Sequence, residues 1–288
     1  MVGFPPGGGA DIVSRIVAPY LAERLGQPVV IENKPGASSN ISIQTVVNSP
    51  PDGYTLLFVP ASAAVNVTLF DNLSFNLLRD IAPVSGLIDF PLVMVANPSL
   101  PAKSVGELIA YAKANPGKIS IGSFGTGSTS HVSGELFKMM AGINLIHVPY
   151  RGEAAALPDL LSGQMQAIFG VMPASLGYIR DGRLRPLGVT SAKRQALLPD
   201  VPAIAEFLPG YEASGWYGVT VPKGTPPQVI DKLNKAVNAA LVDPDTRKRL
   251  DDLGCDVFSG TPADFGKFIA EETQKWAKLN RVANIKAD

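Results

Sequence analysis

The sequence predicts an α/β protein with two lobes. The chain has 288 residues, more than one hydrophobic core usually supports, and 46% of them are apolar while 17% are charged. Apolar runs of strand length alternate with segments of helical spacing, as in parallel α/β sheets. A glycine-rich turn opens a helix in each half of the chain. We therefore expect one lobe of residues 1–103 and 222–288 and a second lobe of residues 104–221, joined by two crossings.

The first glycine-rich turn, Phe4 to Asp11, leads into a helix. After it, apolar residues recur at helical spacing until Gly26, where a helix stop is expected. Unpaired N–H groups at such a helix start point outward at the positive end of the helix dipole, and glycines let a ligand approach them. The turn is therefore predicted to bind an anion, either a phosphate or a carboxylate. For one isolated cluster, a tight turn without a ligand is the alternative interpretation.

The second glycine-rich turn, Gly122 to His131, repeats this pattern in the other half of the chain. If each turn belongs to its own lobe, the two can face each other across a cleft and hold one small anion from both sides. Ser62 follows a predicted strand and is expected on the same rim as the first turn, because loops after the carboxyl ends of parallel strands line the binding crevice. Two such turns favour a ligand site over two unrelated bends.

The remaining elements follow from short apolar runs, helical spacing and capping residues. Strands are expected over residues 29–31, 54–59, 92–96, 119–122, 145–148, 166–169, 184–190 and 216–221. Helices are expected over residues 40–48, 104–114 and 154–161, after the second glycine turn up to Gly142, before Arg180, from a capping box at Thr225 up to Leu241, up to Leu253, and after a cap at Thr261. The last helices are predicted to pack on the first lobe.

The start of the chain is abrupt. A turn that feeds a helix in an α/β lobe normally follows a strand of four to six apolar residues, and only Val2 and Phe4 are available here. No signal peptide is visible before the turn. We expect that the chain was trimmed or that further residues precede Met1 in the natural protein.

Composition argues against several classes of partner. Lysine plus arginine equals aspartate plus glutamate at 25 each, so no basic surface for nucleic acid is expected. One cysteine, Cys255, cannot form an internal disulfide or a cysteine zinc cluster and is predicted to be a small buried residue. With only two histidines, we expect no metal and no cofactor. No apolar run is long enough to span a bilayer, so no membrane insertion is expected.

The sequence gives little support for catalysis. Ser128 and Ser130 lie near His131 in sequence, but a serine hydrolase needs a base and an orienting group placed in space. The G-x-S-x-G elbow is absent, as are the G-x-G-x-x-G and P-loop patterns of nucleotide sites. We therefore predict no catalytic residues. An enzyme that acts on small acids is the competing class.

Several segments in one order resemble a single family over nearly the whole chain. They occupy residues 4–11, 25–30, 32–37, 51–57, 97–104, 147–152 and 198–202. Together they are similar to the periplasmic solute-binding proteins of tripartite tricarboxylate transporters, the Bug family. The resemblance implies a two-lobed periplasmic-binding-protein fold of type II, the Venus flytrap, with two crossovers. It also implies export to the periplasm, a small organic mono- or dicarboxylate as ligand, and delivery to membrane permease subunits.

The resemblance also implies which residues bind the ligand. In such proteins backbone amides and hydroxyls of the two glycine turns hold the carboxylate, partly through water. By position, the implied ligand-binding residues are Phe4, Pro5, Gly7, Gly8, Gly9, Ala10, Asp11, Ser62, Ser123, Gly125, Thr126, Gly127, Ser128, Thr129, His131, Tyr150, Arg151, Gly170 and Val171. The protein is expected to act as a monomer. A binder that reports its ligand to a sensor kinase is a further alternative.

Many relatives carry an acidic residue where this chain has Gly170, in an exit loop that faces the far end of the ligand. Its absence argues against a ligand amino group, as a hypothesis. His131 could contact the ligand or only cap its turn. Arg151 could pair with a second carboxylate or remain a solvated loop residue. His147 is expected in the core, and Trp216 is expected to pack rather than to form a cleft wall.

Overall fold

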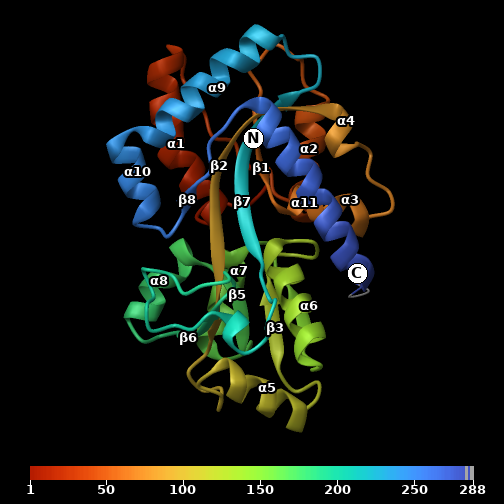
Figure 1. The fold of residues 1–288 in the computed structure, drawn as a ribbon, viewed down its shortest axis with the longest axis vertical. Helices are drawn as coiled ribbons and strands as arrows, with labels where there is room; N and C mark the ends of the chain where they lie inside the picture. Colours follow the sequence, from red (N-terminus) through yellow and green to blue (C-terminus); the bar gives the residue numbers. More distant parts are fainter. Residues whose placement is uncertain (283–284, 286–288) are drawn as a thin grey trace. The chain divides into compact units, whose positions relative to one another are not determined.

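A computed structural model describes residues 1–282 and 285. Its contacts divide the chain into two compact units. Unit 1 comprises Met1–Asp89 and Trp216–Val282, and unit 2 comprises Phe90–Gly215. The chain passes from one unit to the other inside β2 (Ile81–Ala96) and returns inside β7 (Ser214–Pro222), which are the long strands in Figure 1. Both boundaries precede the predicted ones, because these strands continue through the crossings without a break.

Unit 1 combines antiparallel strands with most of the long helices. β1 pairs with β7, with Leu57 opposite Thr220, and β2 pairs with the two-residue β8, with Ile88 opposite Val257. The other elements of unit 1 are α1 (Gly9–Leu25), α2 (Asn40–Val47), β1 (Leu57–Pro60), α3 (Ser62–Leu69), α4 (Leu77–Asp80), α9 (Pro227–Val242), α10 (Pro244–Asp251), β8 (Asp256–Val257) and α11 (Pro262–Val282).

The last helix packs within unit 1, where α11 lies along α3 (Figure 1). Trp216 of β7 and Trp276 of α11 are fully buried, and both indole Nε1 atoms donate to Oε2 of Glu272, at 3.1 and 3.0 Å. Trp216 therefore packs in the core, as predicted. Cys255 is buried as well, with 3% of its surface exposed.

Unit 2 contains the parallel sheet that the sequence predicts. β3 (Ser120–Ser123) pairs in parallel with both β4 (Ile146–Pro149) and β5 (Ala167–Val171). β2 pairs antiparallel with β5, and β6 (Arg185–Val189) pairs antiparallel with β2. The helices of this unit are α5 (Val105–Ala114), α6 (Thr129–Ala141), α7 (Glu153–Ser162) and α8 (Met172–Arg180). The carboxyl ends of β3, β4 and β5 consequently meet at one edge of the sheet.

The capping residues explain where several helices begin. Ser104 accepts from the N–H of Glu107 at 3.2 Å at the start of α5, as predicted. Before α11, Thr261 and Asp264 form the reciprocal bonds of a capping box. The box predicted at Thr225 is wrong, because its hydroxyl donates to the carbonyl of Pro222 instead. Helix α9 begins at Pro227, where a missing N–H costs nothing.

Three predictions for unit 1 are wrong. Residues 29–31 form no strand, and Val30 is 80% exposed; the bridge to Val2 is made further along the chain, by Asn33. Helix α3 begins directly at Ser62, where a loop was expected. β2 starts at Ile81, eleven residues before the predicted strand, although it contains Pro83 and Pro91, which the sequence patterns treat as strand breakers.

Candidate functional site

The first glycine turn leads directly into α1. The helix begins at Gly9 with Gly8 as its N-cap, and no described side chain caps it. The N–H groups of Gly9, Ala10 and Asp11 fall in the first turn, where no carbonyl four residues earlier can accept them within the helix. Gly7 has a φ of 81°, a left-handed conformation that glycine adopts without strain. The start of α1 therefore presents backbone donors at the positive end of its dipole.

Asp11 braces this turn with its side chain. Its carboxylate accepts from the N–H of Gly7 at 3.0 Å, from Arg15 Nε at 2.9 Å and from Asn33 Nδ2 at 3.0 Å. Burial of the carboxyl opposes ionisation, but these hydrogen bonds outweigh it and lower the pKa of Asp11. Asn33 also donates to the carbonyl of Phe4 at 3.0 Å. Because these contacts occupy the carboxylate, the backbone N–H is the donor that Asp11 can offer a ligand.

The sequence patterns did not predict that the loop before α2 is strained. Ala37, Ser38 and Ser39 all have positive φ values, 44°, 48° and 81°, although none is glycine. Such conformations cost free energy and are concentrated at functional sites. Ser62 donates to the carbonyl of Ser38 at 3.1 Å, and Asn66 donates to the same oxygen at 3.0 Å. Ser62 thus supports this loop and is itself buried, with 1% of its surface exposed.

The second glycine turn leads into α6 and is held by its own side chains. Ser128 caps the helix by accepting from the N–H of His131 at 3.3 Å. His131 Nδ1 accepts from the N–H of Gly127 at 3.2 Å, and Ser123 Oγ accepts from the N–H of Gly125 at 3.2 Å. His131 is 5% exposed. His131 therefore bonds within its own turn, and the predicted residues from Ser123 to His131 form one hydrogen-bonded turn.

His147 belongs to this turn rather than to the core. Its Nε2 lies 2.7 Å from Ser123 Oγ, and its ring stacks on that of His131 with centroids 4.1 Å apart. The side chain is half-buried. The prediction of a core histidine is therefore wrong. Sequence reasoning missed it because β4 runs parallel to β3 with His147 opposite Ile121, a pairing that links residues far apart in the chain.

The loop after β4 carries Tyr150 and Arg151. The N–H of Tyr150 donates to the carbonyl of Ser123 at 3.0 Å, which ties this loop to the second glycine turn. The Tyr150 hydroxyl donates to Asp159 at 2.7 Å, and burial followed by the nearby carboxylate raises the pKa of Tyr150 to about 12. Arg151 is exposed. Tyr150 thus remains a neutral donor, and Arg151 is the cation of this edge.

Gly170 and Val171 end β5 at the same edge. Gly170 lies inside the strand, opposite Val93, and not in an exit loop as predicted. The N–H of Val171 donates to Glu153 Oε1 at 3.1 Å. A Cβ atom on Gly170 would lie 3.0 Å from that same oxygen. The expectation that this place lacks a carboxyl group is therefore wrong, because Glu153 supplies one.

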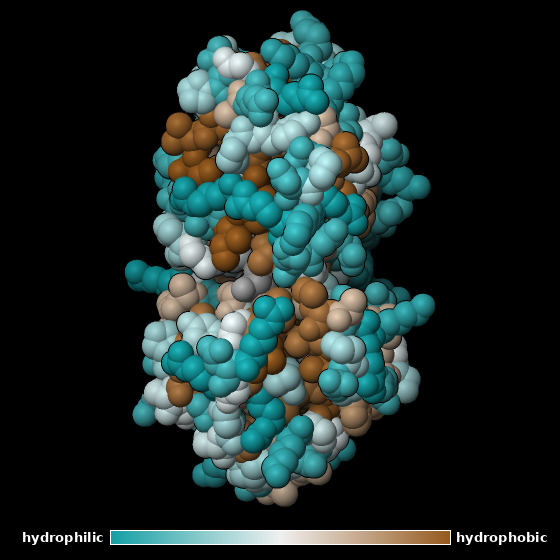
Figure 2. All heavy atoms as spheres, turned by 90° about the vertical axis from the view of Figure 1, so that its left-hand side faces the viewer, coloured by the Kyte–Doolittle hydropathy of each residue, from teal (hydrophilic) through white to brown (hydrophobic). Residues whose placement is uncertain are grey.

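The described residues contain no group of three or more His, Cys, Asp and Glu side chains that could hold a metal ion. They also contain no helix with the length and apolar character needed to cross a bilayer. On the face drawn in Figure 2, hydrophilic residues predominate and hydrophobic ones gather in separate patches.

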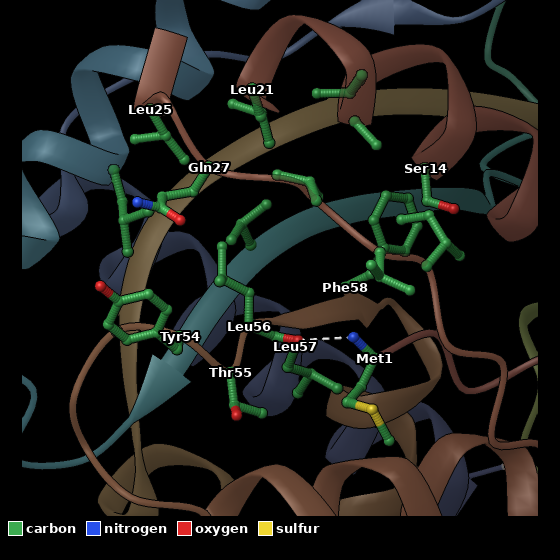
Figure 3. Close-up of a pocket in the computed structure, with 18 of the residues that line it drawn as sticks. Met1, Ser14, Leu21, Leu25, Gln27, Tyr54, Thr55, Leu56, Leu57 and Phe58 are labelled. Carbon is green, nitrogen blue, oxygen red and sulfur yellow. Dashed lines mark hydrogen bonds between the residues drawn. The ribbon is translucent and has the colours of Figure 1, made fainter. Parts of the chain in front are cut away.

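A pocket of about 540 Å³ lies in unit 1 (Figure 3). Leu21 and Leu25 of α1 line it together with Tyr54, and the amino group of Met1 at its edge donates to the carbonyl of Leu56 at 2.8 Å. The lining is mainly aliphatic, and none of the predicted ligand-binding residues contributes to it. The pocket is therefore separate from the amide donors of the first glycine turn.

Comparisons with known proteins agree with one another. Residues 13–285 match the family described as "Tripartite tricarboxylate transporter family receptor". The chain is 39% identical to Protein BugT of Bordetella pertussis over 289 residues, covering 99% of this chain and 89% of BugT.

Two solved structures share the fold throughout. The structure of R. palustris Rpa4515 with adipate has a TM-score of 0.95 and 35% identity, covering 99% of this chain and 96% of that one. MatC (Rpa3494) from Rhodopseudomonas palustris with bound malate has a TM-score of 0.91 and 30% identity, covering 96% and 97%. Fold and sequence lead to one conclusion: this chain belongs to the receptor family of the tripartite tricarboxylate transporters.

Proposed function

We propose that this protein captures a small mono- or dicarboxylate and delivers it to a membrane permease of the tripartite tricarboxylate type, acting in the periplasm as a monomer. The observation that carries the proposal is the start of α1, where no described side chain caps the helix and the first-turn N–H groups have no acceptor within it. Family membership supports it, as do the adipate and malate held by two relatives with the same fold.

Backbone donors suit this task because they recognise negative charge without themselves titrating. In this proposal, the first-turn N–H groups of α1 are donors for a carboxylate in unit 1, and those of α6 are donors for a carboxylate in unit 2. The hydroxyl group of Thr129 adds a donor at the second turn. Binding requires no covalent chemistry, and the protein does not act as an enzyme in this proposal.

Proline substitution at the first helical residue tests the donors one at a time. Gly8 and Ser128, which precede the first residues of α1 and α6, have extended backbones with ψ of 169° and 159°, as a residue before proline requires. Proline is well tolerated at this helical position and removes only the N–H. We expect Gly9→Pro and Thr129→Pro each to weaken carboxylate binding by roughly ten- to a hundredfold, the usual effect of losing a hydrogen bond to a charged group.

The matched controls are Gly9→Ala and Thr129→Ser, which keep the N–H, and in the second case the hydroxyl, and should remain within about threefold of the wild type. Affinities would be measured by calorimetry after a thermal-shift panel of mono-, di- and tricarboxylates has identified a ligand. If both proline variants fold and bind as well as their matched controls, backbone capture at these turns is excluded. Turnover of a bound acid would favour an enzyme. Loss of uptake of the labelled acid by cells lacking the gene would support delivery to a permease.

A further inference from the structure

Glu153, the first residue of α7, is a buried carboxyl group with half of its hydrogen-bonding capacity unused. It is 5% exposed. Oε1 accepts from the N–H of Val171 at 3.1 Å and lies 3.5 Å from Ser175 Oγ. Oε2 is buried and has no hydrogen-bond partner among the described residues. A carboxyl oxygen buried in this way costs free energy unless another group, such as a ligand, completes its hydrogen bonds.

This carboxyl group lies at the edge of unit 2 that carries the second glycine turn. α7 follows β4, and Val171 ends β5, while β4 and β5 both run parallel to β3, which leads into that turn. The bond from Tyr150 N–H to the carbonyl of Ser123 joins the turn to the loop before Glu153. An acid bound at the start of α6 would therefore lie at the same edge of the sheet as Glu153.

Gly170 leaves room for this arrangement. A Cβ atom at position 170 would collide with Ser175 Oγ and come within 3.0 Å of Glu153 Oε1. Gly170 and Glu153 are therefore matched: because Gly170 has no side chain, the carboxyl group of Glu153 has room beside it.

The surroundings keep Glu153 neutral at ordinary pH. β3 and β5, which pack against α7, carry no titratable side chain. On the neighbouring loop and helix, Tyr150 is bonded to Asp159, Arg151 is exposed, and Tyr178 and Arg180 lie further along α8. Burial raises the pKa of Glu153 to about 8, against the smaller lowering effect of the bonds from Val171 and Ser175. The proton can then reside on Oε2 as a donor without an acceptor in the described protein.

We propose that Glu153 donates a hydrogen bond from Oε2 to an oxygen at the far end of the bound acid, and so selects dicarboxylates over monocarboxylates of the same chain length. This assignment rests on the proposed function, because it takes the first carboxylate to lie at the glycine turns. Glu153 is thus a specificity-determining residue, and the chemistry it selects is a second acceptor group on the ligand.

Two sets of three acids, which within each set differ only at the far end, test the assignment. Adipate, hexanoate and 6-aminohexanoate share a carboxylate and chain length but end in a carboxylate, a methyl and an ammonium group; succinate, butyrate and 4-aminobutanoate form the shorter set. We expect the wild type to bind the dicarboxylate of at least one set about tenfold or more tightly than its partners. Glu153→Gln keeps an N–H donor and should retain this preference, whereas Glu153→Met should lose it without a change in monocarboxylate affinity.

The dependence of dicarboxylate affinity on pH distinguishes a ligand contact from a purely structural role, which would leave this dependence unchanged. Dicarboxylate affinity of the wild type should fall above about pH 8, by up to tenfold per unit, because the donor proton is lost while the ligand is already fully ionised. In Glu153→Gln the affinity should stay flat between about pH 7 and 9. Glu212→Gln, at an exposed position of the same unit, is the matched control and should behave as the wild type. The Gln profile remains informative if the Met variant does not fold.

Two outcomes would overturn the assignment while leaving the proposed function intact. One is an equal loss of adipate and hexanoate binding in Glu153→Met, which marks a purely structural carboxyl group. The other is a preference for the ammonium acids that Glu153→Gln abolishes, which makes Glu153 an ionised partner for a cation. If no acid of any class binds the wild type, the proposed function itself fails.

Discussion

Ser123 Oγ lies 2.7 Å from His147 Nε2, and His147 in turn stacks on His131, whose Nδ1 accepts from the N–H of Gly127. The two histidines of the sequence therefore lie together and hold opposite ends of the second glycine turn. Ser123 binds the N–H of Gly125 on one side, and His131 binds that of Gly127 on the other. This arrangement fixes which N–H groups of the turn remain available to a ligand.

Replacing His147 by phenylalanine should loosen this turn without unfolding the protein. The aromatic ring keeps its stacking on His131, but Ser123 loses its bond, which is worth about 1 kcal/mol. We expect carboxylate affinity to fall about five- to tenfold, measured by calorimetry. Ile146→Thr, at an exposed position of the same strand, is the control and should bind as the wild type. Unchanged affinity in His147→Phe would show that the histidine pair does not organise the binding turn.

Asp11→Ala should destabilise the fold by about 1–3 kcal/mol, because it removes a charged acceptor of bonds from Gly7, Arg15 and Asn33. The folded-state pKa of Asp11 lies below its unfolded value, so its stabilisation is present above the ordinary carboxyl range and is lost as pH falls through that range. Urea denaturation of the wild type and the variant near neutral pH measures the difference. Asp71→Ala, at an exposed aspartate, should change stability by less than about 0.5 kcal/mol.

Ala37→Gly should stabilise the protein by up to about 1 kcal/mol. Ala37 is exposed and has a φ of 44°, so glycine relieves the left-handed strain without removing a buried contact. The control is Ala110→Gly, at an exposed position inside α5, which should instead destabilise by about 1 kcal/mol. Thermal denaturation distinguishes the two signs. A loss of stability in Ala37→Gly would mean that the loop gains nothing from relief of strain.

Glu153→Gln should change how stability depends on pH. The pKa of Glu153 is raised to about 8 by burial, so between its unfolded value of 4.5 and about 8 the folded protein keeps a proton that the unfolded chain releases. Stability of the wild type should therefore fall relative to Glu153→Gln as pH rises through this window, by up to about 1.4 kcal/mol per pH unit. Denaturation curves near pH 5 and pH 8 measure the difference. A constant difference would show that Glu153 titrates normally.

The local signals in the sequence were sufficient to locate the glycine turns. Helix α6 ends before Gly142, and α1 ends before Gly26, because both glycines adopt the left-handed conformation that stops a helix. The segment 29–31 has the composition of a strand, but a strand also needs partners, and pairing between distant segments is not encoded in composition.

Other parts of the candidate site depend on contacts that no local pattern reveals. Glu153 has the sequence context of a solvated residue at a helix start, and only the fold buries it against Val171. Gly36 marks a bend, yet nothing in the sequence indicates that Ala37 and Ser38 adopt conformations usually reserved for glycine. His147 likewise gained its partner from the pairing of β4 with β3. Burial and strand pairing are thus what the sequence reasoning could not supply.

The buried thiol of Cys255 makes this protein a convenient background for site-specific labelling. It is the single cysteine of the chain, and burial, followed by the carboxylates of Asp256, Asp251 and Asp89, raises its pKa to about 12. Thiol reagents attack the thiolate, so Cys255 should resist them in the folded state. A cysteine introduced at Thr126, which is half-buried, could then carry an environment-sensitive dye without removal of the native Cys255, turning the receptor into a fluorescent reporter of organic acids.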